Sequence, residues 1–279
     1  MRIRNLILTA LAVAAALEPC HMAGQQSLYQ QIRAHNTRMT EVQPSWMAPL
    51  IQSDSRLSQA IRFSVSNYTT GPAHPIDYGN NHGITAIVQR RLQFDLDPPN
   101  FVRNHATGLS DGFTNLGAQV KVRIASGNAD HHNYALSAIL FHGFAPRAYR
   151  NFALSSYYSP SIAAGKGFGR VAVLTTVGGW LPTAKVTQQG RTIDWNLTGQ
   201  LRVSPHAWID VENNFTHFLG ASIDGHTQNM ITPAAFYMIR RKGWKPEHAA
   251  FVVDGGIQTA TSGFHTFNHN VITELRVLF

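Results

Sequence analysis

The stretch "VITELRVLF", residues 271–279, alternates between two kinds of side chain. Successive side chains of a β-strand point to opposite faces. One face here is apolar apart from a threonine, with Val271, Thr273, Leu275, Val277 and Phe279. The other face carries Ile272, Glu274, Arg276 and Leu278. This pattern is typical of a strand in a soluble sandwich, or in a membrane barrel with lipid outside and a polar lumen inside.

Segments with the same alternation recur from residue 58 onward, separated by Gly, Pro, Asn and Asp. Residues 84–96, "ITAIVQRRLQFDL", are interpreted as one such strand. Charged residues make up only 14% of the chain, against about 25% in ordinary soluble domains. We therefore predict an all-β fold. It would be a single antiparallel transmembrane β-barrel of about 10–12 strands over residues 58–279, preceded by a short N-terminal arm.

The polar faces of the expected strands carry charges of both signs. We interpret these residues as candidates for lining the lumen: Arg62, Lys121, Arg123, Arg202, Asp210, Glu212, Asp254, Glu274 and Arg276. Such charges could form bridges that occlude a narrow barrel, or they could set the selectivity of an open one. The formal net charge of +8 favours anions in an open pore.

The N-terminal residues have the composition of an export signal. Arg2 and Arg4 precede the apolar run "LILTALAVAAAL" at residues 6–17, which is short for a membrane-spanning helix. We predict a signal peptide over residues 1–24. Residues 25–57 would form an N-terminal arm or plug, because the proline-flanked Trp46 suits a docked segment better than a strand. Nucleic acid is not an expected partner of an exported chain.

The C-terminal strand also resembles the C-terminal signature of Gram-negative outer-membrane β-barrels. Those proteins typically end on Phe, with apolar residues at alternate positions before it. The matching residues are Val271, Leu275, Val277 and Phe279. The resemblance implies a location in the Gram-negative outer membrane. It also implies two partners, the outer-membrane lipids and the barrel-assembly machinery that recognises this strand.

A second resemblance covers most of the chain after residue 42. "QPSWMAPLIQSDSRLSQAIRFSV", "DYGNNHGI", "LSDGFTNLGAQVKVRIASGNADHHNYALSAIL" and "GKGFGRVAVLTTVGGWLPT" resemble outer-membrane transporter proteins related to the barrels of meta-pathway phenol degradation. The landmarks are Asp111-Gly112-Phe113 followed by Lys121, and Leu181-Pro182; Asn115 departs from the Asp expected there. The resemblance implies a channel or transporter for small solutes, with hydrophobic or aromatic compounds as one class.

Other chemistry has weaker support in the sequence. The clusters "DHHN" (residues 130–133) and "HTFNH" (residues 265–269) lie in expected loops and lack the converging ligands of a metal site. "GKGFG" (residues 165–169) is interpreted as a flexible turn. No serine lies in a recognisable nucleophile motif. We therefore expect no enzyme activity, cofactor or metal. An outer-membrane hydrolase and a plugged structural barrel without transport remain the alternatives.

Overall fold

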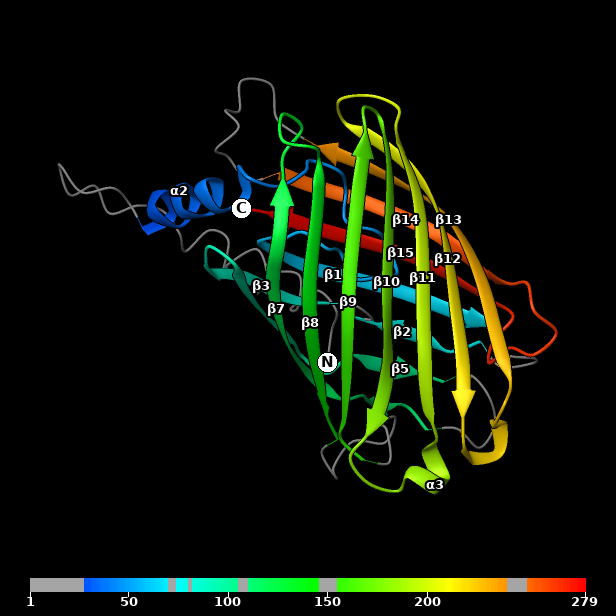
Figure 1. The fold of residues 1–279 in the computed structure, drawn as a ribbon. Coiled ribbons are helices and arrows are strands. Elements are labelled where there is room, and N and C mark those ends of the chain that lie inside the picture. Colours follow the sequence, from blue (N-terminus) through cyan, green and yellow to red (C-terminus); the bar gives the residue numbers. More distant parts are fainter. Residues whose placement is uncertain (1–27, 70–73, 80–81, 105–109, 146–154, 240–249) are drawn as a thin grey trace.

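A computed structural model describes residues 28–69, 74–79, 82–104, 110–145, 155–239 and 250–279. The predicted signal peptide, residues 1–24, lies outside these ranges. The described residues form a closed antiparallel β-barrel of 12 strands, which confirms the all-β prediction (Figure 1).

Each strand of the barrel pairs with its neighbours in an antiparallel ladder. The strands are β1 (Ala60–Thr69), β3 (Gly83–Gln89), β4 (Leu92–Asp97), β7 (Leu116–Gly127), β8 (Tyr134–Phe144), β9 (Tyr157–Phe168), β10 (Val171–Pro182), β11 (Arg191–Arg202), β12 (Ala207–Leu219), β13 (Thr227–Ile239), β14 (Ala250–Ala260) and β15 (His269–Leu278). The barrel closes where β15 pairs with β1 along its full length, from Ala60 opposite Leu278 to Thr69 opposite His269. Closure removes the exposed edges that an open sheet would have.

Three short strands extend the barrel wall beyond β3, β4 and β7. They are β2 (Ile76–Tyr78), β5 (Phe101–Arg103) and β6 (Gly112–Phe113). β2 pairs with β1 and β5, and β5 pairs with β6. Counted from β1, the short strands therefore follow in the order β2, β5, β6, alongside β3, β4, β7. This part of the wall therefore consists of interrupted strands.

Two local predictions were wrong. Residues 84–96 do not form one strand: β3 and β4 are a hairpin whose turn contains Arg90 and Arg91. The turn explains how two adjacent arginines are tolerated, because both are outside the sheet. "GKGFG" is not a flexible turn either, since all but Gly169 belongs to β9. The glycines of β9 have a packing role inside the barrel.

Exposure alternates along the strands as a barrel requires. In β1, Phe63 is 48% exposed and its neighbour Ser64 is 1% exposed. The same alternation exposes the apolar side chains of β7, β11, β12 and β15 on the outside, including Val122, Trp195, Val211 and Leu275. An apolar outer surface matches a lipid environment. None of the described helices is long and apolar enough to cross a membrane.

The two ends of the barrel differ. At the turn end, Arg90–Arg91 and residues 169–170 form two-residue connections, and residues 128–133 and 203–206 form longer ones. At the loop end lie residues 98–104 and 110–115, α3 (Val186–Gln189) and η1 (Ala221–Ile223). Helix α2 (Leu28–Thr40) lies outside the barrel near the C-terminus (Figure 1). Asn36 Nδ2 of α2 donates a hydrogen bond of 2.5 Å to the carbonyl oxygen of Phe279.

Candidate functional site

The chain between α2 and β1 passes into the barrel from the turn end. We call residues 43–59 the inner arm. Trp46, Met47, Leu50 and Leu57 of this segment are at most 7% exposed. Their partners come from strands all around the barrel, as the contacts below show. The inner arm therefore occupies the lumen.

A buried carboxylate binds the main chain of the inner arm. Glu212 of β12 has no measurable exposure. Its side chain accepts hydrogen bonds from the backbone N–H groups of Leu50 (2.6 Å), Ile51 (3.0 Å) and Gln52 (3.0 Å). Both side-chain oxygens of Glu212 accept from the arm in this way. Glu212 therefore fixes one turn of the arm against β12.

A buried guanidinium binds the carbonyl groups next to that turn. Arg276 of β15 donates to the carbonyl oxygens of Ala48 (2.7 Å) and Pro49 (3.3 Å). The same guanidinium forms ion pairs with Asp254 (2.8 Å) and Glu274 (2.9 Å). Glu274 also pairs with Arg62 at 2.6 Å. The arm is thus connected to a charge network that spans β14, β15 and β1.

Apolar packing reinforces these polar contacts. Met47 and Leu50 pack in one buried cluster against the inner faces of β12–β15, whose members are Trp208, Ala234, Phe236, Val252 and Ile272. Apolar side chains on the inner face need a covering partner, because they would otherwise face water. We call β12, β13, β14 and β15 the docking wall.

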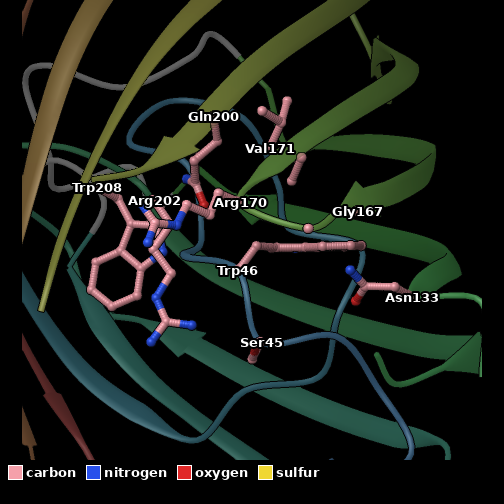
Figure 2. Close-up of a pocket in the computed structure, with 11 residues that line it drawn as sticks. Ser45, Trp46, Asn133, Gly167, Arg170, Val171, Gln200, Arg202 and Trp208 are labelled. Atoms are coloured by element: carbon pink, nitrogen blue, oxygen red, sulfur yellow. The ribbon is translucent and has the colours of Figure 1, made fainter. Parts of the chain in front are cut away.

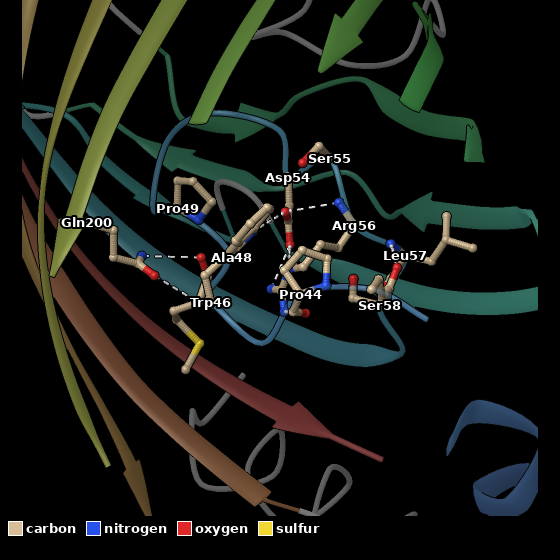
Figure 3. Close-up of polar contacts among 12 residues, drawn as sticks. Pro44, Trp46, Ala48, Pro49, Asp54, Ser55, Arg56, Leu57, Ser58 and Gln200 are labelled. Carbon is tan, nitrogen blue, oxygen red and sulfur yellow. Dashed lines mark hydrogen bonds and ion pairs between the residues drawn. The ribbon is translucent and has the colours of Figure 1, made fainter. Parts of the chain in front are cut away.

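A glutamine side chain on β11 also binds main-chain groups of the inner arm. Gln200 Oε1 accepts from Met47 N at 2.7 Å, and Gln200 Nε2 donates to Met47 O at 3.2 Å (Figure 3). The amide therefore pairs with Met47 as a neighbouring strand residue would.

Small side chains on β8, β9 and β10 let the inner arm approach closely. Ser137 Oγ donates to Ser55 O at 2.5 Å, and Thr176 Oγ1 donates to Ser53 O at 3.1 Å. A Cβ atom at Gly165 would lie only 2.6 Å from the Trp46 ring. Gly165 therefore leaves the space that Trp46 fills.

The inner arm also has internal contacts that hold its shape. Trp46 Nε1 donates to Asp54 Oδ1 at 3.2 Å, and Arg56 forms an ion pair with Asp54 at 2.7 Å (Figure 3). Burial by itself raises the pKa of the Asp54 carboxyl, but nearby Arg56 and Lys121 outweigh burial and hold that pKa below its ordinary value. Gln43 pairs through its side chain with the backbone N–H and carbonyl of Leu57. The arm thus forms a compact loop.

The other predicted lumen residues take different positions. Lys121 Nζ donates to Arg56 O at 3.2 Å, and Arg123 donates to Met39 O and Gln43 Oε1, both at 2.9 Å. Asp210 is 3% exposed on the inner face of β12, two residues before Glu212.

Arg202 does not join this group, because it lies exposed at the turn end. Its guanidinium lies 5.6 Å from the centre of the Trp208 ring. A small pocket of about 40 Å³ beside it is lined by Trp46, Arg170 and Gln200 among others (Figure 2).

The residues predicted as an assembly signal lie along β15 and just after it. Val271 and Leu275 are exposed on the outer face, and Val277 and Phe279 are half-buried. Phe279 N donates to the carbonyl oxygen of Gln59 at 3.3 Å. Among the described residues, no three His, Cys, Asp or Glu side chains form a group that could hold a metal ion.

Next to the docking wall, since β1 pairs with β15, a polar cavity of about 90 Å³ lies between part of the inner arm and β1, β3, β4 and β7. We call these four strands the cavity wall. Two of the lining residues, Asp95 and Asp97 of β4, were not among the sequence candidates. Their alternation with Phe94 and Leu96 was visible in the sequence, but the single-strand interpretation of residues 84–96 obscured the separate strand β4.

The fold is similar to those of solved outer-membrane barrels. A NanC porin structure matches with a TM-score of 0.51 at 6% identity, over 80% of this chain and 99% of that chain. An outer membrane channel from Pseudomonas putida F1 matches with a TM-score of 0.49 at 13% identity, over 84% and 100%. At such low identities the NanC match shows the fold alone. No protein-family model matches the sequence, and no curated protein sequence matches it.

Proposed function

We propose that the protein is an outer-membrane channel for small solutes whose lumen is closed by its own inner arm. The observation that carries this proposal is the recognition of arm main-chain groups by Glu212, Arg276 and Gln200, which project from the barrel wall. An arm bound in this way occupies the space that solutes would cross. Passage then requires the arm to move.

The proposed orientation places the turn end in the periplasm. Outer-membrane barrels have short periplasmic turns and longer extracellular loops. The arm would then enter from the periplasmic side, after export through the signal peptide of residues 1–24. The last strand, with Val271, Leu275, Val277 and Phe279, would be the segment that the assembly machinery recognises.

The solute class rests on the sequence resemblance. Relation to the transporter proteins of meta-pathway phenol degradation implies small solutes, with hydrophobic or aromatic compounds as one class. The expectation that the protein is not an enzyme belongs to the same proposal. A plugged structural barrel is the competing function, and it differs from a channel in never conducting.

Deletion of residues 25–52 tests the channel. The deletion removes the main-chain partners of Gln200 and Arg276, as well as all those of Glu212. We expect a barrel that still shows a heat-modifiable gel shift, because every described strand begins after this segment. In a planar bilayer, we expect larger single-channel conductance than in the intact protein.

Two results would contradict the proposal. A folded deletion variant that conducts no ions would identify a structural barrel. Loss of the gel shift would show that the arm is part of the fold itself and not a separable closing element. Folding is therefore measured on the same preparation as conductance.

A further inference from the structure

The polar cavity beside the inner arm is lined by side chains of the arm and of four barrel strands. Its volume of about 90 Å³ is enough for several water molecules, or for a small ion with part of its hydration shell. The lining includes Gln52 from the arm, Arg62 and Thr85 from β1 and β3, and the side chains of Asp95, Asp97 and Lys121 from β4 and β7. Most of the lining residues carry a polar or charged side chain.

Gln52 shows that this cavity is built for a polar occupant. The residue is 6% exposed, and neither its side-chain nitrogen nor its side-chain oxygen forms a hydrogen bond with any described residue. Leaving a buried amide without partners is unfavourable by about 1–3 kcal/mol. A ligand in the cavity that Gln52 lines would supply the missing partner.

The charges around the cavity do not cancel among themselves. Asp54 is neutralised by Arg56 at 2.7 Å, and Arg62 is bound to Glu274 at 2.6 Å. Lys121 then remains as the single cation facing two carboxylates, Asp95 and Asp97. One negative charge is left over, and it favours a cation of single charge.

The two carboxylates are held differently. Asp95 is 7% exposed and accepts hydrogen bonds from the side-chain amides of Gln93 and Gln119. Asp97 lies two residues further along β4, on the same inward face. Its carboxylate packs over Gly83, where any Cβ atom would collide with Asp97 Oδ1. Gly83 therefore makes room for the Asp97 carboxylate at the cavity.

We propose that this cavity is a binding site for one small monovalent cation, Na⁺ or K⁺. Asp97 and the side-chain oxygen of Gln52 would be direct ligands, and Asp95 would contribute through its charge and through water. Oxygen ligands suit such hard cations. The nearby Lys121 ammonium disfavours a divalent ion by repulsion. Cation binding at this site does not require the barrel to conduct. The proposal of a cation site can therefore be tested independently of the proposed channel.

The test is ²³Na relaxation on the folded, full-length barrel in a non-ionic detergent. We expect faster ²³Na relaxation than in detergent alone, an excess that added K⁺ should reverse. Choline should not reverse it, because its methylated ammonium cannot be coordinated directly by oxygen ligands. The substitution Asp97→Asn keeps the side-chain volume and should abolish the excess. Asp130→Asn, on an exposed turn residue, is the matched control and should leave it unchanged.

A second variant guards against a folding defect in Asp97→Asn. Gln52→Leu removes the amide ligand from the arm without touching the barrel wall, and it should also lower the excess relaxation. The proposal is overturned if the unmodified protein shows no excess, or if every variant that folds retains it in full. Displacement of Na⁺ by Ca²⁺ at far lower concentration than by K⁺ would identify a divalent site and also overturn it.

Discussion

The docking wall and the cavity wall hold the same inner arm in opposite ways. On the docking wall, Glu212 and Arg276 form hydrogen bonds with main-chain groups of the arm, and apolar side chains cover Met47 and Leu50. On the cavity wall, a polar space separates much of the arm from β3 and β4. Lys121 and Arg123 of the cavity wall also form hydrogen bonds with the arm, but the docking wall adds apolar packing to its polar contacts. We therefore expect release of the arm to depend mainly on the docking wall.

The largest expected effect comes from Glu212→Gln on the docking wall. The substitution keeps the shape but replaces one acceptor oxygen by an N–H donor facing the backbone N–H groups of residues 50–52. We expect the free energy of arm docking to become less favourable by about 3 kcal/mol. This raises the ratio of displaced to docked arm roughly a hundredfold. Single-channel recording measures the open fraction.

Glu41→Gln is the matched control for Glu212→Gln, because Glu41 lies exposed before the inner arm. Equal open fractions in the two variants would show that Glu212 on the docking wall does not keep the barrel closed.

A smaller effect is expected from Gly165→Ala on β9. The added methyl group would lie 2.6 Å from the Trp46 ring and 3.1 Å from Ser55 Oγ, both of them arm atoms. Crowding of this kind is unfavourable by about 1–3 kcal/mol, so the open fraction should rise by roughly tenfold. Gly199→Ala is the control, since a Cβ atom there meets nothing within 4 Å. A rise in conductance that is the same for both glycines would show that the effect comes from the strands and not from the arm.

Acid should loosen the arm through Asp54. Arg56 and Lys121 hold the pKa of this carboxyl below 3.8, against the opposing effect of burial. A lowered pKa in the docked state stabilises that state above the ordinary pKa, and the stabilisation disappears as pH falls through the lowered value. We expect Asp54→Asn to raise the open fraction at pH 7 and to lack this acid-dependent component. Conductance measured from pH 7 to about pH 3 checks both; identical pH profiles for the two proteins would exclude Asp54 as the cause.

The smallest effect is expected on the cavity wall. Thr85→Val replaces a hydroxyl that lines the cavity by a methyl group of similar size. Arm docking should change by less than about 0.5 kcal/mol, because no hydrogen bond between the described arm and Thr85 is lost. An open fraction as high as in Glu212→Gln would mean that the cavity lining holds the arm as strongly as the docking wall does, and the contrast between the two walls would fail.

The barrel could be predicted from the sequence because the alternation of apolar and polar residues shows directly which face of a strand each side chain occupies. Glu274 and Arg276 fall on the inner face of β15, while Val271 and Leu275 fall outside, as the period of two requires. The hairpin of β3 and β4 was missed because its two-residue turn is Arg90–Arg91, without the Gly, Asn or Asp that usually marks such turns.

The candidate site was less predictable than the fold. Proline-flanked Trp46 indicated a docked segment, but nothing local indicates which wall receives it. Glu212 and Arg276 were selected for their charge and were expected to face other charges across a lumen. The structure pairs Arg276 with Asp254 and Glu274 but directs Glu212 to backbone N–H groups. Every residue except proline offers a backbone N–H, so the sequence does not show which of them a carboxylate binds. Gln200 was overlooked for the related reason that it is uncharged.

The covalent link between the inner arm and β1 makes closure a unimolecular equilibrium. Leu57 of the arm is separated from Ala60, where β1 begins, by only two residues. A ligand on so short a tether experiences an effective concentration in the millimolar range. Contacts too weak to retain a free peptide can therefore keep the barrel closed. The closed fraction is independent of how many copies the membrane holds, and a soluble peptide copy of the arm would have to reach millimolar levels to replace it.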